Sequence, residues 1–222
     1  MYRRYALYVT PEGPLATHGA AWLGWDIAAG RAVPQPQVGG LDMAEITRRP
    51  RKYGLHATIK PPMVLAVGTT SEELEQAAGA LARSATAVTL DGLEITRMGS
   101  FLALTPRGDT APLRALAARV VEELDPFRAP ASAQELARRR TQTLTPSQQQ
   151  NLIRWGTPHI MQNFRFHITL TGPLKEIEAT TSLVEAYFKP VLPMPFSITH
   201  LTLAGADANG MFHAITRLPL GI

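Results

Sequence analysis

Cysteine is absent from this 222-residue sequence. The absence excludes disulfides, catalysis by a thiolate and zinc sites that are built on cysteine. It also fits a protein of a reducing compartment, and we therefore expect a cytoplasmic protein.

Long hydrophobic runs are also missing. No stretch reaches the roughly 18 apolar residues that a membrane span requires. The apolar run of residues 1–9 is short, and Pro11, Glu12 and Gly13 end it before a signal-peptide core could form. The sequence therefore predicts a soluble, intracellular protein with no membrane partner.

Charged residues are no more frequent than in ordinary globular proteins, at 18% against 45% hydrophobic residues, which argues against disorder. The net charge is +4 and the pI about 9.7. Basic residues cluster at 48–52 and at 138–140. Such clusters attract phosphates or nucleic acid, although a solvated helix end has the same composition. The charge suits an anionic substrate without identifying it.

Hydrophobic periodicity and turn residues predict an alternation of strands and helices. Pro61 with Pro62, and Gly172 with Pro173, are expected to end two of the strands. No interior linker is polar enough to divide the chain, so we expect one domain over residues 1–222. The predicted strands cover residues 4–10, 55–59, 88–98, 101–105, 164–170, 196–204 and 211–218, and the predicted helices cover residues 15–26, 71–85, 111–124, 133–140, 146–155 and 176–187.

A strand, a helix and a pair of strands recur twice along the chain. The first copy begins at His56-Ala57-Thr58-Ile59-Lys60 and the second at His167-Ile168-Thr169-Leu170-Thr171, and a proline follows each at the same distance. Duplicated units of this kind pair about a pseudo-twofold axis. We predict an α+β bilobal fold in which two antiparallel-rich sheets line one central cleft, with the motif of the first lobe at 56–60 and that of the second at 167–171.

The two motifs carry a set of side chains suited to phosphodiester cleavage. Alternate residues of a strand share one face, so His56, Thr58 and Lys60 should point the same way, as should His167, Thr169 and Thr171. One imidazole can take a proton from the attacking hydroxyl while the other gives one to the departing oxygen. Hydroxyls and Lys60 would bind the phosphate oxygens. We expect neither a metal ion nor a cofactor.

A third tripeptide of the same type, His200-Leu201-Thr202, lies within a longer apolar strand. It has neither a proline break nor a basic neighbour, and a single His-x-Thr tripeptide is a weak signal. We interpret His200 as structural.

The paired motifs resemble those of the 2H phosphoesterase superfamily. Longer stretches, among them residues 51–60, 127–130, 135–139 and 164–172, are similar to one branch, the domain of unknown function 1045 proteins, also known as phosphonate metabolism proteins. The resemblance covers nearly the whole chain. It implies a bilobal fold, a central cleft, and His56, Thr58, His167 and Thr169 as site residues. The superfamily acts on cyclic phosphates and 2′-5′ linkages, mostly in RNA or nucleotides, but the substrate does not transfer with the fold.

Other residues are weaker candidates for the site. Tyr53 could stack on a base or bind a phosphate, or it could pack at a strand edge. Arg128, with Arg138 and Arg139, could bind phosphate through two hydrogen bonds. His159 follows Pro158 in a loop and could lie at the fringe of the cleft, but we expect it at the surface.

The leading hypothesis is hydrolysis of a cyclic phosphate or another small phosphodiester by two histidines. One alternative is the processing or ligation of RNA ends that carry a 2′,3′-cyclic phosphate, which would make an RNA end the partner. Another is a module that binds a small phosphorylated ligand without turnover. The sequence leaves open which histidine is the acid, and it does not indicate an oligomeric state.

Overall fold

The computed structural model describes residues 2–131 and 144–221. The helix expected over residues 133–140, and the arginines within it, lie outside these ranges. In the described ranges no helix combines the length and the apolar character needed to cross a membrane.

A seven-stranded antiparallel sheet forms the centre of the molecule, in the order β11-β10-β1-β4-β8-β7-β6. Two pairs of short strands form separate small sheets. The strands are β1 (Arg4–Val9), β2 (Trp25–Asp26), β3 (Arg31–Ala32), β4 (Ala57–Met63), β5 (Val88–Leu90), β6 (Gly92–Met98), β7 (Phe101–Arg107), β8 (Ile168–Thr169), β9 (Phe196–Ile198), β10 (His200–Ala206) and β11 (Phe212–Pro219).

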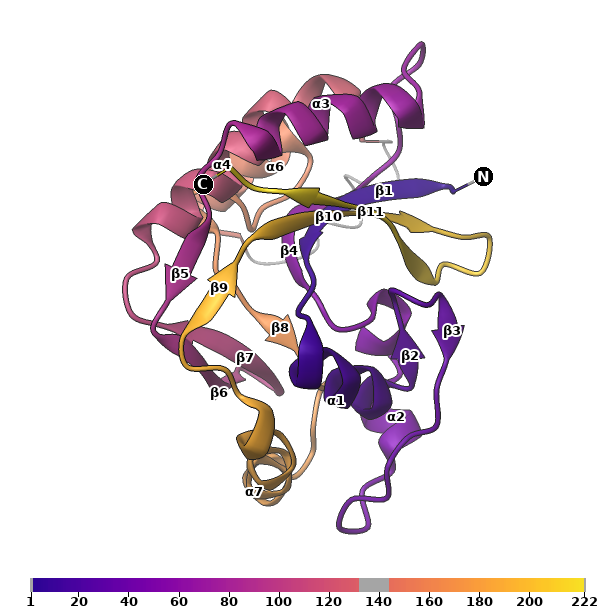
Figure 1. Ribbon diagram of the computed structural model, residues 1–222, viewed down its shortest axis with the longest axis vertical. Helices are drawn as coiled ribbons and strands as arrows, with labels where there is room; N and C mark the ends of the chain where they lie inside the picture. Colours follow the sequence, from indigo (N-terminus) through magenta and orange to yellow (C-terminus); the bar gives the residue numbers. More distant parts are fainter. Residues whose placement is uncertain (1, 132–143, 222) are drawn as a thin grey trace.

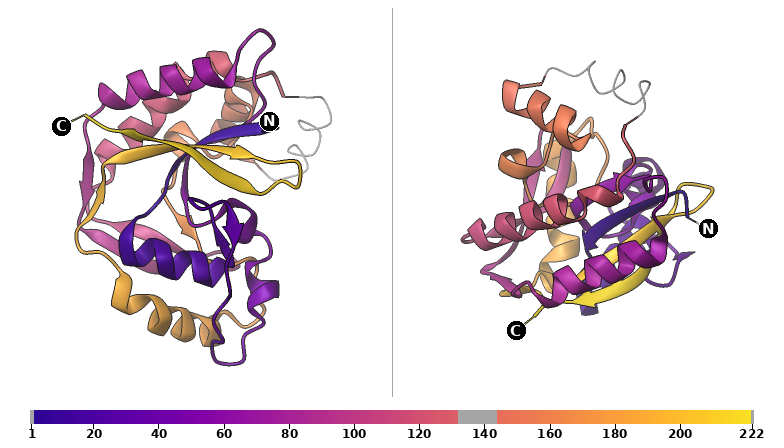
Figure 2. Two further views of the ribbon diagram at one scale, coloured as in Figure 1. Left: turned by 45° about the vertical axis from the view of Figure 1, so that its right-hand side comes forward. Right: turned by 90° about the horizontal axis from the view of Figure 1, so that it is seen from above.

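The helices lie in two groups on opposite sides of the strands (Figure 1). Helices α3, α4 and α6 form the upper group, and α1, α2 and α7 form the lower group (Figure 1); the left view of Figure 2 also keeps these groups apart. Their bounds are α1 (Gly13–Leu23), α2 (Met43–Thr47), α3 (Ser71–Arg83), α4 (Ala111–Glu123), α6 (Pro146–Trp155) and α7 (Ile177–Phe188), with short 3₁₀ turns η1 (Pro50–Tyr53), η2 (Asp125–Phe127), η3 (Met161–Asn163) and η4 (Lys189–Val191).

Two of the helices, α3 and α6, begin at a threonine that caps the helix N-terminus. Thr70 caps α3 and Thr145 caps α6, and in each case the third helical residue, Glu73 or Gln148, returns a hydrogen bond to the cap. A cap of this type stabilises a helix by about 1 kcal/mol. These capping boxes fix the start of two helices that cover the upper side of the sheet.

The two His-x-Thr strands are neighbours at the middle of the sheet. β4 and β8 pair through Ala57 and Ile168, and this single pair joins the two expected sheets into one. The β6–β7 hairpin of the first copy pairs with β8, whereas β10 and β11 of the second copy lie beyond β1, on the side of β4. The two copies are therefore exchanged across the β4–β8 junction: the hairpin of each copy lies on the same side as the motif strand of the other copy.

Strand β4 continues through Pro61 and Pro62 to Met63, so the predicted stop at the prolines is wrong. The pairing of β4 with β1 contains two register shifts, and the prolines lie in the second, between Lys60 and Met63. Proline is tolerated at such bulges because no ladder hydrogen bond needs its missing N–H. Conversely, β8 covers only Ile168–Thr169 of the strand expected over residues 164–170.

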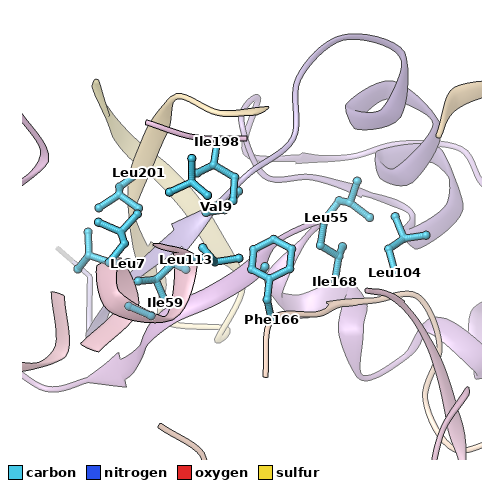
Figure 3. Packing of buried hydrophobic residues seen from close by; sticks show 14 of the residues in the cluster. Leu7, Val9, Leu55, Ile59, Leu104, Leu113, Phe166, Ile168, Ile198 and Leu201 are labelled. Carbon is cyan, nitrogen blue, oxygen red and sulfur yellow. The ribbon is translucent and has the colours of Figure 1, made fainter. Parts of the chain in front are cut away.

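The core lies beneath the β4–β8 junction. Leu7, Ile59 and Ile168 are fully buried there, and Phe166 packs close to Ile168 (Figure 3). Burying an aliphatic side chain of this size contributes roughly 1.5–3 kcal/mol. Ala57 is also fully buried, so both residues of the pair that joins β4 to β8 face the core.

Candidate active site

Strand register brings the two motifs together. Ala57 and Ile168 are directly opposed in antiparallel strands and point into the core. Because side chains alternate, the residues on either side of this pair point to the opposite face. An antiparallel register continued from this pair would set His56 opposite Thr169 and Thr58 opposite His167, and opposed residues in such strands have Cβ atoms about 4.5–5.5 Å apart.

A cavity of about 420 Å³ opens on this face. Both histidines and both threonines line it, together with Tyr53. Its further lining residues are Arg4, Tyr8, Ile59, Pro61, Pro62, Thr157, His159, Ile160, Phe164 and Arg165. Among the residues that the structure describes, this lining contains arginines and histidines but no carboxylate, so the cavity favours an anion.

A carbonyl two residues before His56 orients its ring. Nδ1 of His56 lies 3.0 Å from the Gly54 carbonyl oxygen, which can only accept, so Nδ1 carries the proton. Nε2 then has the free lone pair, and the Thr58 hydroxyl donates to it at 3.1 Å. Gly54 has φ 66° and ψ −177°, a region that is open essentially to glycine alone.

His167 is held by the same device. Its Nδ1 lies 2.8 Å from the Arg165 carbonyl oxygen, again two residues earlier. The proton on Nδ1 is thereby fixed, and Nε2 is the nitrogen left for chemistry. The two histidines are thus matched in orientation as well as in sequence.

Aromatic residues surround His56. The centroid of the Tyr8 ring lies 3.9 Å from the centroid of the His56 ring, and that of the Tyr53 ring lies 5.7 Å from it. Burial lowers the pKa of His56 to about 4; the Gly54 carbonyl opposes this shift and the nearby His167 adds to it. His56 is therefore neutral at physiological pH.

Tyr8 is fully buried, and burial raises the pKa of its phenol well above the usual value. Its hydroxyl has no hydrogen-bond partner within residues 2–131 and 144–221. The phenol therefore stays protonated at neutral pH and can donate a hydrogen bond.

Lys60 does not share the face of His56 and Thr58, so this prediction is wrong. The first register shift in β4 lies between Thr58 and Lys60 and turns the lysine away. Its side chain is only 3% exposed, and Nζ donates to the Val121 carbonyl at 3.0 Å, with Asp125 Oδ1 at 3.6 Å. Burial lowers the pKa of Lys60 to about 8, against the opposing effect of Asp125.

Thr171 also lies outside the cavity, contrary to the prediction. It is fully buried, and its hydroxyl accepts a hydrogen bond from the Leu102 backbone N–H at 3.0 Å. β8 ends at Thr169, so the alternation that would have brought Thr171 to the site does not continue that far. Its role is to fix the chain to β7.

Arg128 lines a second, neighbouring cavity rather than that of the histidines. Two of its nitrogens contact Asp125, with Nε 2.7 Å from Oδ1 and Nη2 3.1 Å from Oδ2. Tyr53, in contrast, lines the cavity of the histidines.

Sequence reasoning missed Arg4, Tyr8, Thr157 and Arg165 among the lining residues. One signal was available for Arg165, because it stands two residues before His167. His159 is exposed, as predicted, but it also lines the cavity. Its pKa is lowered by burial and by the neighbouring His167 and Arg165.

His200 lies apart from this site, as expected. It lines a different cavity, and its Nδ1 is 2.9 Å from the Thr199 hydroxyl. Over the described parts of the chain, no three histidine, aspartate or glutamate side chains are arranged to hold a metal ion.

Comparison with protein families matches residues 58–213 to the family described as Protein of unknown function (DUF1045). The match covers more than half of the chain and contains the second motif. It begins at Thr58, two residues after His56.

Two curated relatives carry the name ribose 1,5-bisphosphate phosphokinase PhnN. The protein from Janthinobacterium sp. (strain Marseille) is 36% identical over an alignment 218 residues long, which covers 93% of this chain and 48% of that protein. The protein from Laribacter hongkongensis (strain HLHK9) is 31% identical over an alignment 187 residues long, which covers 82% of this chain and 43% of that protein. The chain spans about half the length of the curated relatives it matches.

Among solved structures, E. coli LigT in complex with NADP⁺ has a similar fold, with a TM-score of 0.50 over the whole of this chain and 99% of LigT. The sequences are 14% identical. This likeness confirms the predicted fold class.

Proposed function

The chain belongs to the DUF1045 family, with the fold of LigT-type 2H phosphoesterases, and on this premise we propose that its cavity hydrolyses a cyclic phosphate by acid–base catalysis with His56 and His167. The supporting observation is the matched pair of imidazoles. Each has Nδ1 fixed by the carbonyl two residues earlier, and both line one cavity.

The roles of the two histidines differ in this proposal. His56 is the general base, because its lowered pKa keeps Nε2 unprotonated at neutral pH. A water molecule displaces the Thr58 hydroxyl from Nε2, gives its proton to His56 and attacks phosphorus. The ring P–O bond breaks, and the leaving oxygen takes a proton from the imidazolium of His167. The products are a phosphate monoester and one hydroxyl group, and proton exchange with solvent restores both histidines.

In this proposal, protein side chains and not a metal ion stabilise the negative charge on the phosphate oxygens. Thr58 and Thr169 supply hydroxyl donors next to the two imidazoles. Arg4 and Arg165 line the same cavity and provide positive charge where the attacked phosphate becomes more negative.

The name of the curated relatives suggests the substrate class. It states that those proteins phosphorylate ribose 1,5-bisphosphate, and this chain corresponds to about half of them. Hydrolysis of a cyclic ester on a ribose that also carries a 5-phosphate would yield a ribose bisphosphate. We therefore place the substrate among cyclic phosphates of phosphorylated ribose, such as ribose 1,2-cyclic phosphate 5-phosphate.

The test is hydrolysis of a panel of cyclic phosphates by the purified chain in the presence of EDTA, followed by ³¹P NMR. The panel contains ribose 1,2-cyclic phosphate 5-phosphate, ribonucleoside 2′,3′-cyclic phosphates and a linear 2′-5′ dinucleotide. We expect conversion of a cyclic ester to a monoester, and loss of that conversion in His167→Ala. Turnover only after a divalent metal is added would contradict the mechanism.

A further inference from the structure

A second cavity, of about 330 Å³, adjoins that of the histidines. Arg4, Pro61, Pro62, Thr157 and Ile160 line both, so the two form one continuous depression. An extended ligand could therefore occupy both at once.

The charged side chains that line this second cavity are all basic: Arg4, Lys60 and Arg128. Of the described residues, no aspartate or glutamate lines it. The carboxylate of Asp125 contacts Lys60 and Arg128 but is not part of the lining. It therefore neutralises at most one of the two cations, and the surface that remains is positive.

Lys60 is unusual among the residues that line this cavity because its side chain is almost completely buried. Its side chain is only 3% exposed, and within residues 2–131 and 144–221 its ammonium has one hydrogen bond to a protein acceptor, the Val121 carbonyl. Burying a cation costs free energy when the carboxylate beside it binds another cation more closely. A bound anion offsets that cost. Arg128 takes both oxygens of Asp125, at 2.7 and 3.1 Å, and leaves Lys60 the weaker contact.

Glycine makes room for Arg128 at the edge of the cavity. Gly156 ends α6 with φ +73°, and a Cβ at this position would lie 3.1 Å from Nη1 of Arg128. The backbone therefore approaches the guanidinium more closely than a side chain would comfortably allow.

We propose that this second cavity binds a phosphate monoester group of the substrate, with Lys60 and Arg128 in its floor and Arg4 at the rim that it shares with the histidine cavity. The inference rests on the proposed function. In this inference, the second cavity gives the protein its preference for a ribose that carries a 5-phosphate over a ribose that lacks this group. Lys60 and Arg128 thus act on substrate choice, at a distance from the bond that breaks.

The test compares ribose 1,2-cyclic phosphate with and without its 5-phosphate. In the unmodified chain we expect kcat/KM to be at least about 10-fold higher for the phosphorylated compound. One hydrogen bond to a charged group is enough to produce a difference of this size. In Lys60→Met and Arg128→Gln the ratio of the two values should fall toward 1. Arg3→Gln, which removes the exposed arginine next to Arg4, should leave the ratio unchanged. A ratio that stays at the value of the unmodified chain in both variants would overturn the proposal.

Two further measurements keep the outcome decisive. Arg4→Gln alters an exposed side chain and tests the rim even if Lys60→Met fails to fold. Calorimetric binding of ribose 5-phosphate tests the subsite without turnover. If the chain hydrolyses no cyclic phosphate but binds ribose 5-phosphate, and Arg4→Gln and Arg128→Gln each weaken that binding about 10-fold while His167→Ala does not, the subsite stands and the proposed reaction fails. Binding that is absent, or equal in Arg4→Gln, overturns the subsite.

Discussion

The ring of Tyr8 lies 3.9 Å from the ring of His56 at an angle of 36°. Tyr8 comes from the first strand of the chain and His56 from the residue before β4, and the pairing of Tyr8 with Thr58 brings them together. This contact removes water from the imidazole and underlies the lowered pKa of His56. It links the fold of the sheet directly to the protonation state of His56, the proposed base.

The lowered pKa predicts a specific pH dependence of stability. Between the ordinary pKa of 6.5 and about 4, unfolded His56 binds a proton that folded His56 does not. The free energy of unfolding must therefore fall as the pH falls through this window, by up to about 3 kcal/mol from this residue. Urea unfolding at pH 7 and pH 4.5 should show a smaller loss for His56→Gln than for the unmodified chain. Equal losses would mean that the site leaves the affinity of His56 for protons unchanged.

Replacing either histidine should abolish most of the turnover. His56→Ala and His167→Ala each remove one partner in proton transfer, a loss of about 10²–10⁴-fold in kcat. The double variant should lose much less than the product of the two losses, because base and acid act in one displacement. His200→Ala is the control, since His200 lines a different cavity, and its kcat should be unchanged. Loss of activity in His200→Ala alone would show that the wrong tripeptides have been paired.

The threonines should matter less than the histidines. Thr58→Val and Thr169→Val each remove one hydroxyl from the phosphate oxygens, and we expect a loss of about 10-fold in kcat/KM. Thr89→Val on β5, an exposed position far along the chain from either motif, is the matched control. If Thr58→Val were as damaging as His56→Ala, the hydroxyl would have a role in proton transfer that the proposal does not contain.

Gly54 should be required for the orientation of His56. With φ +66°, alanine is strained there, and its Cβ would lie 2.6 Å from Cβ of Ile27. Gly54→Ala should therefore lower both the free energy of unfolding and kcat, because the carbonyl that holds Nδ1 must move. Gly40→Ala tests strain alone: its φ is +78° and no atom lies within 4 Å of the added Cβ. It should cost some stability and no activity, and a loss of kcat in Gly40→Ala would remove the case for a specific role of Gly54.

Much of the site was predictable from the sequence because alternation along short strands is a local property. His56 and Thr58, and His167 and Thr169, each share a face across a single intervening residue, and Ala57 and Ile168 between them are apolar enough to be buried. The match between the two copies then indicated that the strands meet.

The parts that failed depend on non-local pairing. Lys60 is two residues further along β4, but the register shift arises from pairing with β1 and leaves no trace in the tripeptide itself. Thr171 lies beyond the end of β8, where the chain turns to donate to and accept from Leu102 in β7. Arg4 and Tyr8 join the site only because β1 lies next to β4, which no motif in the sequence indicates.

The pH dependence of kcat/KM, measured from pH 3 to pH 9 with EDTA present on the best cyclic phosphate of the panel, tests the central claim most directly. Paired-histidine catalysis predicts a bell-shaped profile. Its acid limb should lie near pH 4, where His56 becomes protonated and no longer accepts a proton, and its basic limb marks the loss of the proton from the general acid. An acid limb that persists unchanged in His56→Ala, or a profile that exists only with added divalent metal, would contradict the account.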